Sequence, residues 1–185
     1  MDNGMQLFMN LGEGLLNNIL LTVLSCIVPL LFGCLMTVLF ALTKKLRFIR
    51  NIFQGTSLIS ESLCPAITII VVFYLPGMVL ANGLDRWLAV ILGFTISFLG
   101  YMVKRYDQRD SILKNLLVNS LGLTSTVFKW SFVVGYVGVL DMLRAGTKYM
   151  AVTVSLWGVL ITLAISFVIL LVIEGIRYLL KELLK

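Results

Sequence analysis

The chain has 185 residues, of which 59% are apolar and only 13% are charged, and its mean hydropathy is +1.02. A soluble domain of this length cannot bury so much apolar surface, so the composition excludes a soluble protein and indicates one that dissolves in lipid. The net charge of +6 does not indicate nucleic-acid binding, because the basic residues form short clusters between apolar runs.

The apolar runs predict an all-α membrane protein with one transmembrane domain, residues 1–185. Each run is continuous rather than alternating, and a helix needs about 20 apolar residues to cross the membrane, whereas a barrel strand alternates. The runs predict five transmembrane helices, at about 15–43, 62–84, 87–103, 116–140 and 149–173. Residues 174–185 follow as an amphipathic tail on the cytoplasmic surface. Pro65 and Pro76 predict a kinked or broken second helix.

The distribution of Lys and Arg predicts the orientation. Eleven of them lie in three segments on one side, 44–50, 104–114 and 177–185, against three on the other side, Arg86, Arg144 and Lys148. Positive loops stay in the cytoplasm, so we expect the N-terminus outside and the C-terminus inside. No Lys or Arg precedes residue 44, which is not typical of a cleavable signal peptide, and we expect the first run to be retained.

Two charged residues fall within or beside the predicted spans. Glu61, at the start of the second span, is close enough to the basic elbow to snorkel or to pair with Arg50, which is the interpretation we favour over a transport role. Lys129 lies deeper, among small and polar residues that include Thr126 and Ser131. Such a lysine either packs against carbonyls at a helix break or lines a transport path, and the sequence supports both equally.

Catalytic and metal-binding patterns are lacking in the sequence. Without histidine, the usual nucleophile and base pairs and the common zinc sites cannot form. No nucleotide-binding glycine loop occurs, and no paired acids share a span. We therefore expect no enzyme activity, no metal and no cofactor bound by this chain.

Several segments resemble the permease subunits of polar-amino-acid ABC importers. Residues 14–25 are similar to the opening helix of that family, and 53–59, with Gly55 and Thr56, to its entry into the second span. The best match is 129–141, where Lys129, Gly138 and Asp141 keep the family's register. Glu174 followed by Arg177 resembles the Glu-Arg pair that closes these permeases.

The resemblance implies a permease in the cell (inner) membrane that works by alternating access in a dimer with a second permease. It also implies two cytoplasmic ATP-binding subunits, which use the ATP, and an extracytoplasmic substrate-binding protein. Lys129, Ser131, Thr126 and Glu61 then become candidates for the transport path.

One interval departs from the family pattern. Family members carry a long cytoplasmic loop with a Glu-Ala-Ala motif that docks in the ATPase, whereas here the interval is only 104–115 and lacks the motif. This favours a reduced permease, the non-coupling half of a heterodimer, or a non-transporting scaffold or accessory subunit derived from one. If an ATPase is contacted at all, the candidates are in this interval: Arg105, Tyr106, Asp107 and Arg109.

Overall fold

A computed structural model describes residues 3–42, 51, 53–55, 57, 62–80, 84–106, 110–153 and 156–184, and most of these residues lie in helices. Seven α-helices and one short 3-10 helix, η1, occur within these ranges. In chain order they are α1 Asn3–Leu42, α3 Pro65–Leu80, α4 Arg86–Phe98, α5 Tyr101–Lys104, α6 Ile112–Ser131, η1 Val134–Val137, α7 Met142–Thr153 and α8 Trp157–Leu183.

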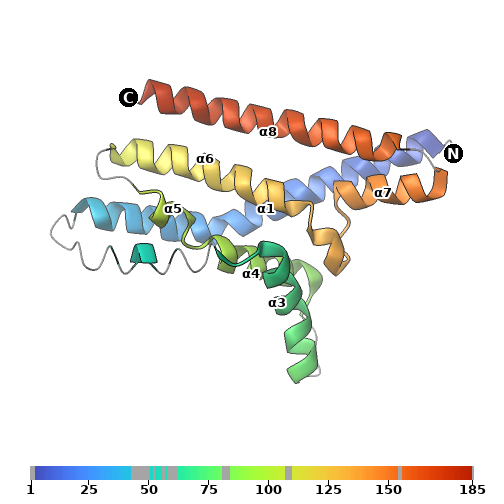
Figure 1. The fold of residues 1–185 in the computed structure, drawn as a ribbon, viewed down its shortest axis with the longest axis horizontal. Coiled ribbons are helices and arrows are strands. Elements are labelled where there is room, and N and C mark those ends of the chain that lie inside the picture. Colours follow the sequence, from blue (N-terminus) through green and yellow to red (C-terminus); the bar gives the residue numbers. More distant parts are fainter. Residues whose placement is uncertain are drawn as a thin grey trace.

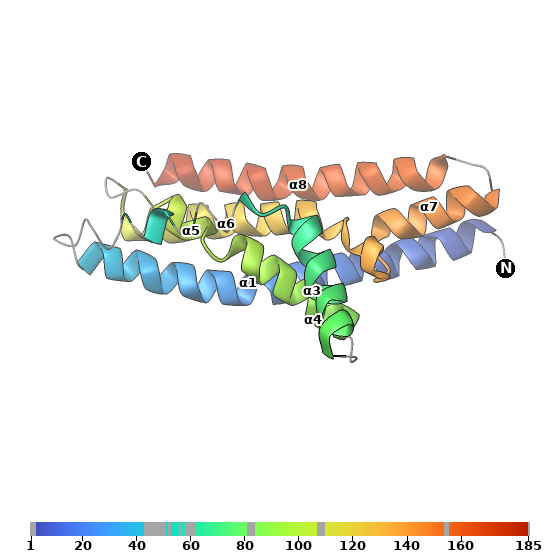
Figure 2. The same ribbon diagram turned by 60° about the horizontal axis from the view of Figure 1, so that its bottom comes forward.

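Helix α6 lies at the centre of the arrangement, between α1 and α8 (Figures 1 and 2). Helix α7 packs against both α1 and α8, near the N-terminus of the chain. Helices α3 and α4 project from the side of the molecule that is opposite α8. The largest apolar core is where α1, α3, α4, α5 and α6 meet, and it includes Leu21, Phe94, Met102 and Leu123, none more than 1% exposed.

Three segments of the described chain are long and apolar enough to cross a membrane: Met5–Ala41, Arg86–Lys104 and Trp157–Leu183. Pro65–Pro76 is a shorter apolar helix. Helix α6 has the length but carries Lys114, Asn115, Asn119 and Lys129. Because it packs between α1 and α8, those two apolar helices separate much of α6 from the surroundings.

Helix bounds differ from the predicted spans most in the C-terminal half. Helix α6 begins at Ile112 but ends at Ser131, so a helix does not continue to residue 140. The region predicted as the fifth span begins within α7, and α8 starts only at Trp157. The amphipathic tail expected at 174–185 is not a separate element, because α8 continues without a break to Leu183.

A tight turn separates η1 from α7, a few residues after the end of α6. Gly138 closes η1 in the left-handed conformation, with φ of 86°, which side chains with a Cβ rarely adopt. Asp141 then precedes α7, and its carboxylate accepts a hydrogen bond from the backbone N–H of Arg144 (2.6 Å), as an N-cap does. Because the residues around Gly138 and Asp141 are apolar, the hydrophobicity of the sequence does not reveal this turn.

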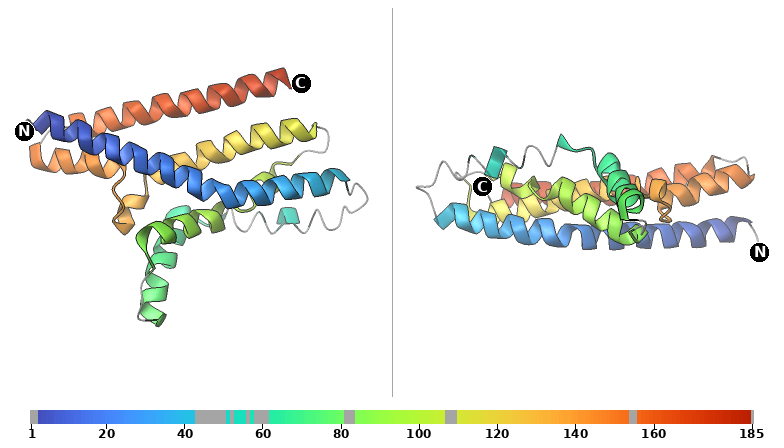
Figure 3. Two further views of the ribbon diagram at one scale, coloured as in Figure 1. Left: turned by 180° about the vertical axis from the view of Figure 1, so that it is seen from behind. Right: turned by 90° about the horizontal axis from the view of Figure 1, so that it is seen from below.

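The prolines have different effects. Pro65 is the first residue of α3, a position that lacks an intrahelical hydrogen-bond donor in any case, so it starts the helix rather than breaking it. Pro76 lies inside α3, and Pro29 lies inside α1. Helix α1 has 40 residues, about 60 Å at 1.5 Å per residue, and it changes direction near its middle (Figure 3). It begins at Asn3, well before the start predicted at 15.

Helices α7 and α8 approach each other closely at a pair of glycines. A Cβ on Gly146 would lie 2.7 Å from the carbonyl oxygen of Gly158, and a Cβ on Gly158 would lie 2.9 Å from the carbonyl oxygen of Gly146. Next to them, the Thr162 hydroxyl donates a hydrogen bond to the backbone oxygen of Met142 (3.2 Å). The two backbones therefore touch, with no side chain between them at this crossing.

Candidate functional site

A carboxylate on α8 collects three donors from two helices. The Ser125 hydroxyl donates a hydrogen bond to Glu174 Oε1 (2.7 Å), and Lys129 Nζ forms an ion pair with the same oxygen at 3.6 Å. Arg177 Nη1 donates to Glu174 Oε2 at 3.1 Å. We call Ser125, Lys129, Glu174 and Arg177 the α6–α8 network. Both oxygens of the carboxylate are thus engaged, and every donor is a side chain.

A glycine on α6 makes room for this arrangement. A Cβ on Gly122 would lie 2.8 Å from the hydroxyl oxygen of Tyr101 and 2.9 Å from the guanidinium carbon of Arg177. One turn further on, the Thr126 hydroxyl donates to the Gly122 carbonyl (2.8 Å) and lies 3.4 Å from the Tyr101 hydroxyl. Tyr101, Gly122 and Arg177 therefore bring α5, α6 and α8 together at one point.

The structure pairs Lys129 with an acid on another helix. Its side chain is 51% exposed, so it is neither enclosed in the core nor isolated. Helical side chains lean toward the N-terminus of their helix, and this lean carries the ammonium group of Lys129 back along α6 to the level of Glu174. The described chain supplies a carboxylate partner for this lysine, rather than only the carbonyls of a helix break.

A charged cleft opens beside the network, between the end of α5, the start of α6 and the last turns of α8. Its volume is about 510 Å³. The charged side chains that line it define what we call the basal cleft: Arg105, Asp110, Lys114, Glu174, Arg177 and Lys181. Glu174 and Arg177 belong both to the cleft and to the network, so the two form one continuous charged region.

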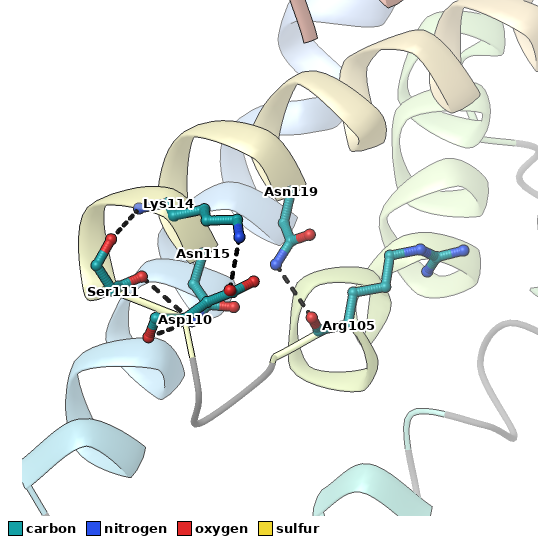
Figure 4. Close-up of polar contacts among 6 residues, drawn as sticks. All are labelled: Arg105, Asp110, Ser111, Lys114, Asn115 and Asn119. Carbon is teal, nitrogen blue, oxygen red and sulfur yellow. Dashed lines mark hydrogen bonds and ion pairs between the residues drawn. The ribbon is translucent and has the colours of Figure 1, made fainter. Parts of the chain in front are cut away.

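Local hydrogen bonds hold the wall of the basal cleft in place (Figure 4). Ser111 is the N-cap of α6 and accepts from the backbone N–H of Lys114 (3.2 Å), while Lys114 Nζ forms an ion pair with Asp110 at 2.6 Å. Asn119 Nδ2 donates to the carbonyl of Arg105 (3.3 Å), tying the end of α5 to α6. The Arg105 side chain extends away from the Asp110–Lys114 pair.

Two of the four predicted ATPase-facing residues are described. The Arg105 guanidinium lies 3.6 Å from the centre of the Tyr101 ring, a cation–π contact, and it is exposed. Tyr106 packs its ring against Phe40 of α1, with 5.5 Å between ring centres. Asp107 and Arg109 lie outside the described residues.

At the other end of α6, Asp141 organises the turn into α7. It is 1% exposed, and its carboxylate accepts from the backbone N–H groups of Gly135 (2.8 Å) and Arg144 (2.6 Å). Burial raises the pKa of Asp141 above its ordinary value, and these hydrogen bonds only partly offset that rise. Arg86 Nη1 donates a long hydrogen bond, 3.5 Å, to the carbonyl of Gly138. Gly138 and Asp141, the two residues of this segment that resemble a family motif, therefore shape this turn.

Two other sequence candidates that the structure describes, Ser131 and Gly55, do not join the network. Ser131 is fully buried, and its hydroxyl donates to the carbonyl of Phe128 (2.8 Å). Gly55 is exposed, with open space where a Cβ would be. Glu61 and Thr56 lie outside the described residues, as does the Arg50 partner considered for Glu61. In the described ranges, no group of three Cys, Asp or Glu residues is placed to hold a metal ion.

The spacing of residues in the sequence does not identify two members of the network, Ser125 and Glu174. Ser125 is one of several hydroxyl residues on α6, and nothing in the sequence distinguishes the one that faces α8. The charge pattern places Glu174 at the start of a tail, although the similarity of Glu174 and Arg177 to a family motif marks both residues. The Lys129–Glu174 pair joins helices far apart in the chain, so a single sequence has no pattern that reports it.

The fold matches the transmembrane subunits of amino-acid importers. Across 95% of this chain and 94% of the other, it superposes with a TM-score of 0.72 and 17% identity on a chain from the crystal structure of an amino acid ABC transporter with histidines. Across the whole of both chains, it superposes with a TM-score of 0.74 and 15% identity on a chain of the MetNI methionine ABC transporter in an inward-facing conformation. No protein-family model and no curated protein matches the sequence. The likeness confirms the resemblance at the level of the fold.

Proposed function

We propose that this chain is a membrane-embedded permease subunit of an ABC-type importer for amino acids or similar small polar solutes. It works by alternating access in a dimer with a second permease and itself catalyses no reaction. The observation that carries the proposal is the correspondence of the fold over the full length of two importer subunits, at TM-scores of 0.72 and 0.74. Shared fold alone does not define a function, so the site has to support it.

The polar character of α6 provides that support. A helix packed between two apolar helices gains nothing in stability from Lys129, Thr126 and its other hydroxyl residues, since apolar residues would pack there at lower cost. Polar groups retained at membrane depth are typical of paths for polar solutes. We assign Lys129 to the transport path, with Glu174 as the partner that holds its ammonium group while no solute is present.

The topology that we propose has five membrane crossings, formed by α1, α3, α4 with α5, α6 and α8. The N-terminus lies outside the cell and the basal cleft faces the cytoplasm, because the segments rich in Lys and Arg flank that end. The partners in this arrangement are a second permease, cytoplasmic ATP-binding subunits that use the ATP, and an extracytoplasmic substrate-binding protein.

The test is purification of the chain from its native membrane in mild detergent, with identification of the bound chains by mass spectrometry and assays of ATP hydrolysis and solute uptake. We expect an ATP-binding subunit and a second permease to copurify, and amino acids to alter the ATPase rate. Lys129→Met should lower uptake at least about tenfold, because it removes the charge held by Glu174. Lys148→Met, an exposed lysine on α7, is the matched control.

A second function is favoured by one specific observation. The connection from α5 to α6 comprises only residues 105–111, which is short for a helix that docks in an ATPase. This favours a non-transporting scaffold or accessory subunit derived from a permease. Copurification without any ATP-binding subunit, together with wild-type behaviour of the Lys129→Met chain, would support the scaffold and contradict the transport proposal.

A further inference from the structure

Tyr101, the first residue of α5, lies between two arginines that belong to different parts of the fold. The guanidinium of Arg105, one turn later, is 3.6 Å from the centre of the Tyr101 ring, and its Nη1 donates a hydrogen bond to the Tyr101 carbonyl (3.3 Å). At the other end of the ring, the hydroxyl lies near Arg177 of α8. Tyr101 is only 4% exposed, so packing fixes its position. The ring therefore spans the distance from the α5–α6 connection to the α6–α8 network.

The Tyr101 hydroxyl and the Arg177 guanidinium share the space that Gly122 leaves open. The position of a Cβ on Gly122 is 2.8 Å from the hydroxyl oxygen, 2.9 Å from Arg177 Cζ and 3.0 Å from Arg177 Nη2. The Thr126 hydroxyl, 3.4 Å from that of Tyr101, holds the phenol oxygen on the α6 side. A guanidinium that moved from Glu174 into this space would meet the Tyr101 hydroxyl. Tyr101 therefore confines Arg177 against the carboxylate.

Glu174 divides its carboxylate between two cations. Arg177 Nη1 is 3.1 Å from Oε2, whereas Lys129 Nζ is 3.6 Å from Oε1. Because Oε1 also accepts a hydrogen bond from Ser125 at 2.7 Å, Lys129 is held more weakly than Arg177. If Arg177 moves away, the full attraction of the carboxylate is left to Lys129, and their ion pair becomes closer. The position of Arg177 thus decides how firmly Lys129 is held.

Arg105 is placed to set the position of the Tyr101 ring. It lies at the end of α5, where the α5–α6 connection begins, and its backbone carbonyl accepts a hydrogen bond from Asn119 Nδ2 of α6 (3.3 Å; Figure 4). A guanidinium over an aromatic face is attracted by the electrons of the ring, so the two groups move together. A displacement of the connection therefore carries Arg105 and, with it, the ring of Tyr101.

We propose that Tyr101 is a positioning residue for the α6–α8 network, through which the α5–α6 connection controls how firmly Glu174 holds Lys129. When the connection moves, the ring turns, its hydroxyl shifts beside Gly122, and Arg177 moves toward or away from Glu174. This link is a property of the chain by itself. Only its consequence for transport, the release of Lys129 in the transport path, rests on the function proposed above.

The experiment measures how fast an acetylating reagent modifies Lys129 in the purified full-length chain in neutral detergent, with the peptides quantified by mass spectrometry. An amine held in an ion pair is less available to the reagent than a released one. Arg177→Gln leaves Glu174 to Lys129 alone and should slow acetylation roughly threefold, the effect expected of one partly exposed ion pair. Tyr101→Phe removes only the hydroxyl and should slow it about twofold. Tyr149→Phe removes a hydroxyl on α7 and, as the matched control, should leave the rate unchanged.

The part played by Arg105 is tested by combining substitutions. Arg105→Gln releases the ring, so the hydroxyl no longer confines Arg177, and acetylation of Lys129 should slow about twofold. In the Tyr101→Phe chain the same substitution should cause no further change, because the hydroxyl through which it acts is missing. Lys114→Gln also removes a positive charge at this end of the molecule, where Lys114 pairs with Asp110, and should have no effect.

Three results would overturn the proposal, with all chains compared at equal helix content. An unchanged rate in Arg177→Gln would show that the hold on Lys129 does not depend on Arg177. An unchanged rate in Tyr101→Phe would show that the hydroxyl does not confine Arg177. Equal slowing by Arg105→Gln with and without the Tyr101 hydroxyl would show that Arg105 acts by its charge alone. Because no uptake is measured, a chain that transports nothing still confirms or refutes this link.

Discussion

Asp141 and Glu174 are two carboxylates with several donors each, but they are held in different ways. Asp141 is 1% exposed and accepts its two short hydrogen bonds from backbone N–H groups. The Glu174 side chain is 38% exposed, and among the described residues it is engaged by the side chains of Ser125, Lys129 and Arg177. Backbone donors cannot leave without unfolding the turn, whereas side chains can rotate to other partners. The first carboxylate therefore fixes a shape, and the second is free to exchange partners.

The largest loss of stability that we expect comes from Asp141→Ala, which removes the carboxylate that fixes the turn. The substitution leaves the N–H groups of Gly135 and Arg144 without their acceptor and removes the cap of α7. We expect a loss of about 2–3 kcal/mol in the free energy of unfolding, measured by thermal unfolding in detergent. Asp85→Ala is the control, because Asp85 caps α4 in the same way but is exposed, and it should cost about 1 kcal/mol. Equal losses would contradict a special role for the buried acid.

The pH dependence of stability provides a second test of Asp141. Because burial raises the pKa of Asp141 in the folded chain above 3.8, the folded state holds this proton more tightly than the unfolded state. The stability that protonation of Asp141 adds is therefore fully present below about pH 3.8 and is lost as the pH rises through the raised pKa. The difference in unfolding temperature between wild type and Asp141→Asn should shift in favour of wild type as the pH falls toward 4. A difference that is constant with pH would be evidence against a raised pKa.

Glu174→Gln should affect stability much less. The amide oxygen still accepts from Ser125, and the two ion pairs that are lost are partly exposed, so we expect a loss of no more than about 1 kcal/mol. If the chain is a permease, uptake should fall far more than stability does. Glu182→Gln, near the end of α8, is the control. A loss as large as that for Asp141→Ala would make Glu174 a structural residue too.

The smallest change that we expect comes from Gly122→Ala. The added methyl group approaches the Tyr101 hydroxyl and the Arg177 guanidinium to less than 3 Å, but both are ends of flexible side chains that can move. Stability should fall by about 0.5 kcal/mol or remain the same, because alanine also favours the helix. Displacement of Arg177 should loosen its pair with Glu174, so Glu174→Gln should cost less stability in the Gly122→Ala chain than in the wild-type chain, which a double-mutant cycle measures.

The long apolar helices were predictable from the sequence, and the reasons are simple. Runs without charges made the helical cores of α1 and α8 evident. Helix ends were less accessible, because hydrophobicity does not stop where a helix stops: the apolar residues after Ser131 hide the turn at Gly138. At Glu174 the opposite happens: the apolar run ends at this first charged residue, whereas helix α8 continues to Leu183.

The candidate site was predictable only in part. Lys129 was identified by its depth, and Gly138, Asp141, Glu174 and Arg177 by their similarity to family motifs. What joins them depends on the packing of α6 against α8, which brings Ser125 and Glu174 within 2.7 Å. The same packing buries Ser131 away from the network. Which face of a helix meets a neighbour is set by the tertiary structure, so spacing along one chain cannot report it.

The glycine crossing of α7 and α8 has a mechanical consequence. It lies at the start of α8, a single helix of 27 residues and about 40 Å, while the charged region lies at the far end. The backbones of the two helices are in direct contact at Gly146 and Gly158, and Thr162 bonds to Met142 beside them, so α8 is held there and has a fulcrum at this point. A tilt of about 10° around that point would sweep the far end through about 7 Å, by the geometry of a rigid rod of that length. A small rotation at one end of α8 would thus become a displacement of molecular size at the other end.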